Sequence, residues 1–324
     1  MEEFNEGYVK SPVDGTRIWY RFYPEGEKPV IIFSNGIACD TSYWRYLVRD
    51  FMGKHPMLIW DYRGHGNSDL PSDFTKSSMD ILVEDLHAIV KHLELNNYIL
   101  VGHSMGVQFN YEYYKHYPED VVGLVPILGT YGYPFKTFFD MDIMEKIYPT
   151  LLYPFLKKFG NLLISTIAPI ASTSIPFYIG LALKSINPCL SSKEKMRPYF
   201  EHLAKLNMEF AAEMFLHMSR HTAEDVLPEI KVPVLIIAGE NDTFTPLWLS
   251  QKMKDMIPTA EMIILEKGSH AALVEYPDLI HCKIKEFIQE RVIPYIQQQH
   301  KILKMPQQKN NIRTRKTRRG REEK

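Results

Sequence analysis

A short apolar run that ends in a glycine–serine–glycine turn is the feature that most limits how this chain can fold. Tyr98–Val101 (Tyr-Ile-Leu-Val) leads directly into Gly102–Gly106 (Gly-His-Ser-Met-Gly), and a helical pattern continues to about His116. The run suits a strand buried in a parallel sheet, and the two glycines let a strand and a helix approach closely. A serine at such a turn carries its side chain above the sheet, which predicts that Ser104 is a nucleophile rather than an ordinary surface serine.

Strand-like and helix-like segments alternate through most of the chain. Apolar spacing predicts a helix over 78–93, and further helices are expected after Pro246 and from near Ala271. This order of elements produces βαβ units, and hence an α/β fold with a mostly parallel central sheet and helices on both faces. The predicted strands are Arg17–Tyr23, Val30–Ser34, Pro56–Trp60, Tyr98–Val101, Val121–Leu128, Val234–Ala238 and Glu261–Leu265.

The alternation stops between about Tyr131 and Val226, which predicts an insertion into the sheet. The segment is rich in aromatic and aliphatic residues, and 159–183 contains no charged residue. Pro169 and Pro176 would break a membrane-spanning helix, so broken helices that cover a hydrophobic pocket are preferred, with contact at a membrane surface left open. The predicted organisation is a core of residues 1–130 and 227–298, a helical lid of 131–226 and a basic, disordered tail of 299–324.

Composition narrows the class of protein. The chain has 324 residues, of which 45% are hydrophobic and 24% charged, as in ordinary globular proteins. Cys39, Cys189 and Cys282 are far apart, which predicts free thiols and neither a disulfide framework nor a zinc site. The acidic N-terminus lacks the apolar segment of a secretory signal, so we expect a cytoplasmic protein.

The formal net charge of −1 conceals a strong asymmetry. From His300 to Lys324 there are ten Lys/Arg and two Glu, a net charge of +8, so the other 299 residues together carry −9. A basic tail can bind nucleic acid or a membrane surface, although a solvated end without a specific partner is the preferred interpretation. The oligomeric state is left open.

Two loops downstream of Ser104 carry the groups that would activate it. A serine hydroxyl needs a base beside it, and that base needs a third group to orient it. Asp242 lies in the loop after the strand Val234–Ala238, and His270 follows the last strand. In open α/β sheets catalysis gathers at the carboxyl ends of the strands, so we predict Asp242 as the acid and His270 as the base. Glu240 is the competing acid, and we expect it to tether the loop instead.

Five segments in one order resemble motifs of the α/β-hydrolase family, in its large group of esterases, lactonases and C–C hydrolases. The resemblance spans about residues 8–295 and implies the α/β-hydrolase fold with a lid over the active site. It implies a catalytic triad of Ser104, Asp242 and His270, and an oxyanion hole formed by the backbone N–H groups of Ile37 and Met105. The matching segments are Ser34–Ile37, Asp61–Ser68, Gly102–Gly106, Gly239–Pro246 and Gly268–His270.

The chain departs from the family pattern at two positions. Asn35 stands where a histidine is common, and Val107 stands where many relatives have a second glycine. His65 lies between two glycines, in a segment similar to the loop that follows the fourth strand of the family's fold. We expect it to have a structural role. His103 is expected to pack at the end of its strand.

The reaction that these residues predict is hydrolysis of a carboxylic ester through an acyl-enzyme, without a metal or an organic cofactor. The apolar lid predicts a small lipophilic substrate with a hydrophobic acyl or alcohol group. Cleavage of a C–C bond or a lactone by the same triad is the alternative within enzymes. A non-catalytic relative that binds a ligand is the alternative of another class.

Overall fold

The computed structural model describes residues 4–138 and 143–304. Its centre is an eight-stranded sheet in the order β1-β2-β4-β3-β5-β6-β7-β8. β2 is antiparallel to both of its neighbours, β1 and β4, and the other neighbouring strands are parallel, which confirms the predicted α/β class. The strands are β1 (Asn5–Lys10), β2 (Arg17–Tyr23), β3 (Val30–Ser34), β4 (Met57–Trp60), β5 (Tyr98–His103), β6 (Val121–Ile127), β7 (Val234–Gly239) and β8 (Ala260–Leu265).

Side chains that alternate along each strand build a separate core on each face of the sheet. In β3, Ile32 joins one cluster of buried residues, whereas Ile31 and Phe33 join the other. Successive strand residues point to opposite faces, so a fully apolar strand supplies both cores. The first face is covered by α2 (Met79–His92), α3 (Met105–His116) and α9 (Leu247–Met256), and the second by α1 (Arg45–Phe51) and α11 (Pro277–Phe287).

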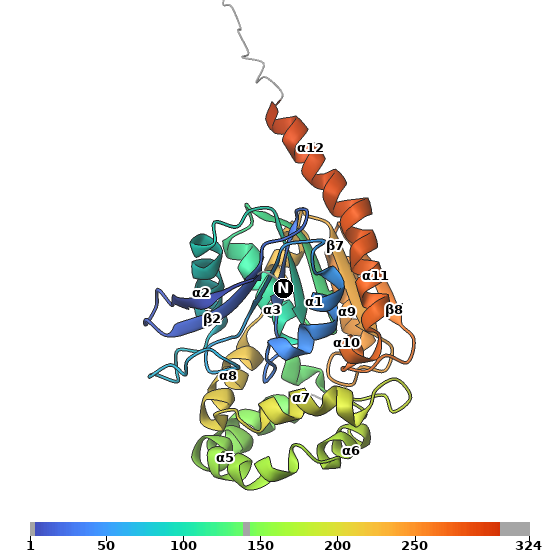
Figure 1. The fold of residues 1–324 in the computed structure, drawn as a ribbon. Helices are drawn as coiled ribbons and strands as arrows, with labels where there is room; N and C mark the ends of the chain where they lie inside the picture. The colour runs from blue at the N-terminus through green and yellow to red at the C-terminus, as the bar shows by residue number, and fades with distance from the viewer. Residues whose placement is uncertain (1–3, 139–142, 305–324) are drawn as a thin grey trace, which may run out of the picture.

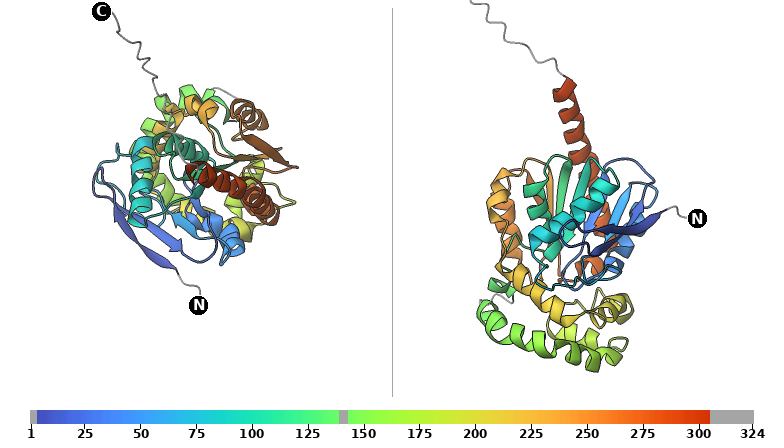
Figure 2. Two further views of the ribbon diagram at one scale, coloured as in Figure 1. Left: turned by 90° about the horizontal axis from the view of Figure 1, so that it is seen from above. Right: turned by 90° about the vertical axis from the view of Figure 1, so that its left-hand side faces the viewer.

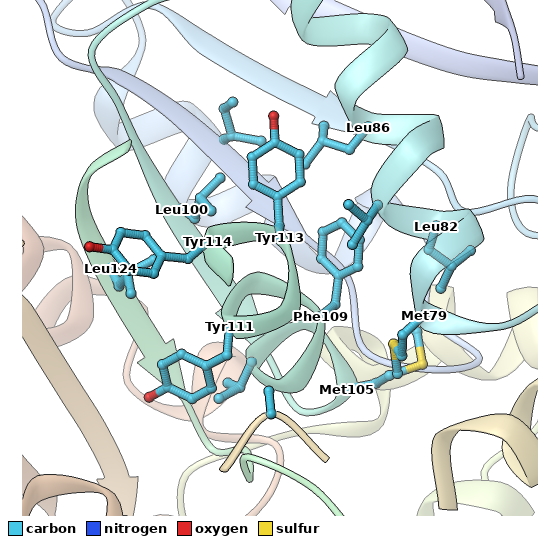
Figure 3. Packing of buried hydrophobic residues seen from close by; sticks show 14 of the residues in the cluster. Met79, Leu82, Leu86, Leu100, Met105, Phe109, Tyr111, Tyr113, Tyr114 and Leu124 are labelled. Atoms are coloured by element: carbon cyan, nitrogen blue, oxygen red, sulfur yellow. The ribbon is translucent and has the colours of Figure 1, made fainter. Parts of the chain in front are cut away.

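The core under α3 supports the turn that carries Ser104. Phe109 and Tyr113 of α3 face the α2 side chains Leu82 and Leu86 (Figure 3), and the four residues are completely buried. A helix held this firmly on its partner and on the sheet provides a rigid base for the residue before it.

Between β6 and β7 the chain leaves the sheet and builds a helical lid at one pole of the molecule (Figures 1 and 2). An isolated antiparallel bridge between Gly132 and Thr222 joins the two ends of the insertion. Pro176 stands in the first turn of α6, where a missing N–H costs nothing, so this proline begins a helix. Pro154 instead follows the π-helical turn inside a helix that runs on from α4 into α5. The lid helices are α4 (Ile143–Ile147), a π-helical turn (Tyr148–Leu152), α5 (Tyr153–Ile167), α6 (Ile175–Ala182), α7 (Lys193–Leu203) and α8 (Met208–Arg220).

β1 is absent from the strands predicted by sequence. Most of its side chains are exposed, so it carries little of the apolar signal that marks the inner strands. It pairs antiparallel with β2 along its whole length, from Asn5 opposite Phe22 to Lys10 opposite Arg17.

The single long helix expected from near Ala271 is divided. α10 (Ala272–Glu275) ends before Pro277, which starts α11. After α11 a π-helical turn leads into α12 (Ile293–Lys304). Residues 299–304, assigned by sequence to the tail, thus continue α12. Residues 305–324 lie outside the described residues, and the partners predicted for the basic tail stay predictions.

Candidate active site

Ser104 occupies a tight turn between β5 and α3. Its backbone has φ 55° and ψ −116°, a conformation that costs energy in a residue with a side chain. The flanking glycines make the turn sterically feasible. A Cβ atom on Gly102 would lie 2.4 Å from the carbonyl oxygen of Gly106, and one on Gly106 would lie 2.3 Å from the carbonyl oxygen of Ser34. The strand–turn–helix context predicted for Ser104 is confirmed.

The structure brings the three predicted triad side chains into one chain of hydrogen bonds. His270 Nε2 lies 3.1 Å from Ser104 Oγ, and His270 Nδ1 lies 2.8 Å from Asp242 Oδ2. They come from the loops after β5, β7 and β8, at the carboxyl ends of parallel strands on one side of the sheet, with β6 between β5 and β7. This is the nucleophile–base–acid geometry that activates a hydroxyl.

Asp242 is buried and held ionised. Burial raises the pKa of its carboxyl group, but the charge of His270 and the hydrogen bonds from His270 and Thr245 outweigh burial, so the pKa lies below the usual range. Oδ1 accepts the backbone N–H groups of Phe244 and Thr245 at 2.8 and 3.0 Å, and Oδ2 accepts the Thr245 hydroxyl at 2.7 Å. The carboxylate is therefore held in one orientation beside His270.

Glu240, the competing acid, has the tethering role that we expected. Its Oε2 accepts the backbone N–H of Lys267 at 2.7 Å, which links the loops after β7 and β8. No hydrogen bond that the structure describes joins Glu240 to His270.

The loop predicted to supply one oxyanion N–H lies against Ser104. A Cβ atom on Gly36 would be 3.2 Å from Cβ of Ser104, so the residue that follows it, Ile37, is carried next to Ser104. Met105 is the first residue of α3, where backbone N–H groups have no partner within the helix. The roles of the Ile37 and Met105 N–H groups stay predictions.

His65 supports this loop. Its Nε2 accepts the backbone N–H of Ala38 at 3.2 Å, while Nδ1 lies 3.0 Å from the carbonyl oxygen of Arg63 and donates to it. Both bonds require a neutral ring, and burial lowers the pKa of His65 to about 4. Its imidazole therefore acts as a structural link between two loops, as expected.

This arrangement predicts an acid-sensitive stability. Because the pKa of His65 is lower in the folded state than the usual 6.5, the unfolded chain binds more protons between pH 6.5 and 4, and stability falls as the pH falls through that window. We expect the wild type to lose about 2 kcal/mol more than His65→Gln between pH 7 and pH 5. Urea unfolding of both proteins at the two pH values measures this difference, and equal losses would contradict the assignment.

Asn35 and Val107, which depart from the family pattern, are both accommodated by packing. Asn35 is buried, donates to the carbonyl oxygen of Trp60 at 3.0 Å and accepts the indole N–H of Trp44 at 2.7 Å. Val107 packs on Gly129, where a Cβ atom would lie 2.3 Å from Cγ2 of the valine. Neither departure from the family pattern therefore disturbs the packing around the candidate active site.

His103 packs at the end of β5, as predicted, and it also contacts the loop that carries His270. Its Nε2 lies 3.2 Å from the carbonyl oxygen of His270, and the two rings are 5.1 Å apart. Burial lowers the pKa of His103 to about 3, so the ring is neutral at physiological pH.

Sequence reasoning missed Glu275. This buried carboxylate accepts the backbone N–H and the hydroxyl of Ser269, at 2.9 and 2.5 Å, and the backbone N–H of Asn187 in the lid at 2.7 Å. It therefore joins the loop that carries His270 to the lid. No sequence signal marks it, because its partners come from distant parts of the chain.

Ser104 and His270 open into a cavity of about 700 Å³ between the sheet and the lid. Its wall is almost wholly apolar, and many of its side chains come from lid helices. Representative lining residues are Phe135, Leu156, Ile164, Ile179, Phe200 and Met208.

One group of side chains in the described part of the chain has ligand atoms close enough to hold a metal ion. Asp80, Glu112 and His116 place these atoms within 4.8 Å of one another. Glu112 already accepts from His116 and contacts His221 at 2.8 Å. Glu112 is eight residues along α3 from Ser104, or about 12 Å, so this group is separate from the candidate active site.

A family model described as the alpha/beta hydrolase fold matches residues 29–277. Protein ABHD8 of Homo sapiens is 25% identical over 275 residues, which are 80% of this chain and 55% of that protein, so this chain spans about half its length. Epoxide hydrolase 4 of Mus musculus is 22% identical over 295 residues, covering 87% of this chain and 79% of the relative. An esterase (EaEST) from Exiguobacterium antarcticum has a similar fold, with a TM-score of 0.69 at 17% identity, covering 88% of this chain and 100% of that one.

Proposed function

Because this chain belongs to the alpha/beta hydrolase family, we propose that it is a serine hydrolase that cleaves a carboxylic ester with a hydrophobic acyl or alcohol group. The observation that carries the proposal is the hydrogen-bonded chain Ser104–His270–Asp242, which opens into an apolar cavity. The family alone sets only the broad class of hydrolase, so the ester rests on the chemistry of the site.

The first step forms an acyl-enzyme. His270 Nε2 takes the proton of Ser104 as the hydroxyl oxygen attacks the ester carbonyl, and Asp242 stabilises the imidazolium that results. The N–H groups of Ile37 and Met105 stabilise the oxygen that becomes negatively charged. As the tetrahedral intermediate collapses, His270 gives its proton to the leaving alcohol.

The second step releases the acyl group. A water molecule gives a proton to His270 Nε2 and attacks the carbonyl carbon that is bound to Ser104. The same N–H groups stabilise the second oxyanion, and the proton returns to Ser104 as the acid leaves. The two steps need no metal and no organic cofactor.

The chemistry of serine argues against carrying the epoxide hydrolase name over from a relative. Attack of Ser104 Oγ on an epoxide carbon would form an ether, which the water of the second step cannot hydrolyse. An ester or a lactone instead leaves an acyl group on serine that water can remove. Lactones and C–C bonds beside a carbonyl therefore stay the alternatives within this site.

Hydrolysis of p-nitrophenyl esters of increasing acyl length tests the proposal. The apolar cavity favours medium chains, so we expect kcat/KM to rise from acetate to octanoate by up to about 10³-fold, at roughly 0.8 kcal/mol for each buried methylene. A fluorophosphonate should add to Ser104, which peptide mass spectrometry would locate.

Three outcomes would count against the proposal. Faster turnover of acetate than of octanoate would contradict a hydrophobic pocket. Labelling of Ser104 without turnover of any ester would favour a lactone or C–C substrate. Failure of both labelling and turnover would favour a relative that binds a ligand without reaction.

A further inference from the structure

The outer side of the lid is apolar and open to solvent over α5 and α6. Ten of the eighteen large apolar side chains that are exposed in the described part of the chain lie between Leu151 and Leu183. Leu162 is 68% exposed and Tyr178 is 64% exposed. We call the exposed apolar side chains of residues 151–183 the lid face; it includes Leu151, Phe155, Leu162, Ile175, Tyr178 and Leu183.

Helical spacing separates the lid face from the wall of the cavity. Phe155, Phe159 and Leu163 recur four residues apart on α5 and so lie along one side of the helix. Leu156 and Ile164 of the same helix line the cavity. The inner side of α5 therefore has a packing role, whereas the outer side contacts solvent, which is unusual for an apolar patch of this extent.

The cavity reaches the lid face. Ile167, Ile179 and Leu183 each line the cavity and are also more than 40% exposed. Its apolar wall is thus continuous with the exposed apolar side chains of α5 and α6. A ligand that entered there would pass from the lid face to Ser104 without crossing a charged surface.

The chain segment that carries the lid face has basic residues only. Residues 146–193 contain five lysines and no acidic residue. Lys157 is paired with Glu213 on α8 at 2.6 Å and Lys193 with Glu194 at 3.9 Å, so two of these cations have an acidic partner within the lid. Apolar side chains flanked by lysines match a bilayer with anionic headgroups. Two copies placed face to face would instead bring their lysines together.

The lid face is suited to lie on a bilayer. No helix in the described ranges 4–138 and 143–304 is both long and apolar enough to span a membrane alone, and the one apolar pair, Ile143–Ile170 with Ile175–Ala182, is bent by 111°. α5 and α6 form the pole opposite α12 (Figures 1 and 2), so nothing described lies outside them.

We propose that the lid face docks on the surface of a bilayer that contains anionic lipid, with the mouth of the cavity against the acyl chains. The docking depends on the lid face alone. Its consequence, that a lipophilic ester enters the site directly from the bilayer, rests on the proposed function.

Flotation of the full chain with lipid vesicles tests the docking. Vesicles of phosphatidylcholine with phosphatidylserine should bind the wild type more strongly than phosphatidylcholine alone. The double variant Leu162→Asp/Tyr178→Asp should lower the partition coefficient by about tenfold or more, because it places charges in the apolar interface. Leu70→Asp/Leu279→Asp is the matched control, since both leucines are 41% exposed and lie outside the lid. An unchanged thermal midpoint verifies that each variant is folded.

Four results would overturn the docking proposal. The first is that the wild type does not bind vesicles. The second is that the folded lid variant binds them as strongly as the wild type. The third is that the control variant loses as much binding as the lid variant. The fourth is loss of binding on removal of 305–324 while the lid variant still binds, which would assign binding to the basic tail. If the wild type does not bind vesicles, sedimentation velocity shows whether a second copy covers the lid face instead. In that case the wild type should be a dimer and the lid variant a monomer.

Ser104→Ala separates this proposal from the proposed function. The lid face is intact in that variant, so it should bind vesicles as the wild type does. Vesicle binding without ester turnover would leave the docking standing and contradict only the ester hydrolase. Turnover without vesicle binding would contradict only the docking.

Discussion

Replacement of Ser104 by alanine is expected to lower kcat for the best p-nitrophenyl ester by about 10⁵- to 10⁶-fold, the scale at which hydrolases of this chemistry lose activity with their serine. The alanine methyl group cannot form the acyl-enzyme, and His270 then has no hydroxyl to deprotonate. Binding and the N–H groups of Ile37 and Met105 would remain, so a small rate above that in water is expected. Steady-state rates and the amplitude of the acylation burst measure the effect.

Two companion variants show whether the loss belongs to the hydroxyl. Ser72→Ala removes an exposed serine hydroxyl from the loop between β4 and α2 and should retain full activity. Ser104→Gly also removes the hydroxyl but relieves the strain at φ 55°, so it should be as inactive as alanine and somewhat more stable. Retention of more than about a tenth of the activity in Ser104→Ala would exclude Ser104 as the nucleophile.

The elements around Ser104 could be predicted from sequence because their signals are local. Apolar runs bounded by turn residues located β2–β8 to within about two residues, since buried parallel strands have few polar side chains. The glycines at 102 and 106 marked the turn for a steric reason that the structure bears out. His270 and Asp242 could be selected because they follow late strands whose carboxyl ends meet at one edge of the sheet.

What could not be predicted depends on partners that are distant in sequence. Arg63 is completely buried, with both its Nε and Nη2 atoms within 2.8 Å of the Asp85 carboxylate, and Asp14 lies 2.8 Å from Nη1. Glu275 joins the loop that carries His270 to the lid in the same way. A single sequence gives no measure of which charged residues meet, so these links appear only in the structure. β1 escaped detection for a different reason, because an exposed edge strand lacks an apolar pattern.

Asp242→Asn is expected to lower kcat by about 10⁴-fold with little effect on the fold. Oδ1 accepts two backbone N–H groups that cannot turn away, so the asparagine oxygen must occupy that position. The NH₂ group then faces His270 Nδ1 and donates to it, which forces the proton of the neutral ring onto Nε2. A histidine that presents an N–H to Ser104 cannot accept its proton.

Glu240→Gln is the matched control for the choice of acid. Glutamine retains an oxygen that can accept the N–H of Lys267, so this variant should keep kcat within about tenfold of the wild type. A smaller loss in Asp242→Asn than in Glu240→Gln would identify Glu240 as the orienting acid. Dependence of kcat on pH adds a readout that a purely structural role would not change. In Asp242→Asn, activity should recover partly at high pH, where hydroxide replaces the base that His270 no longer provides.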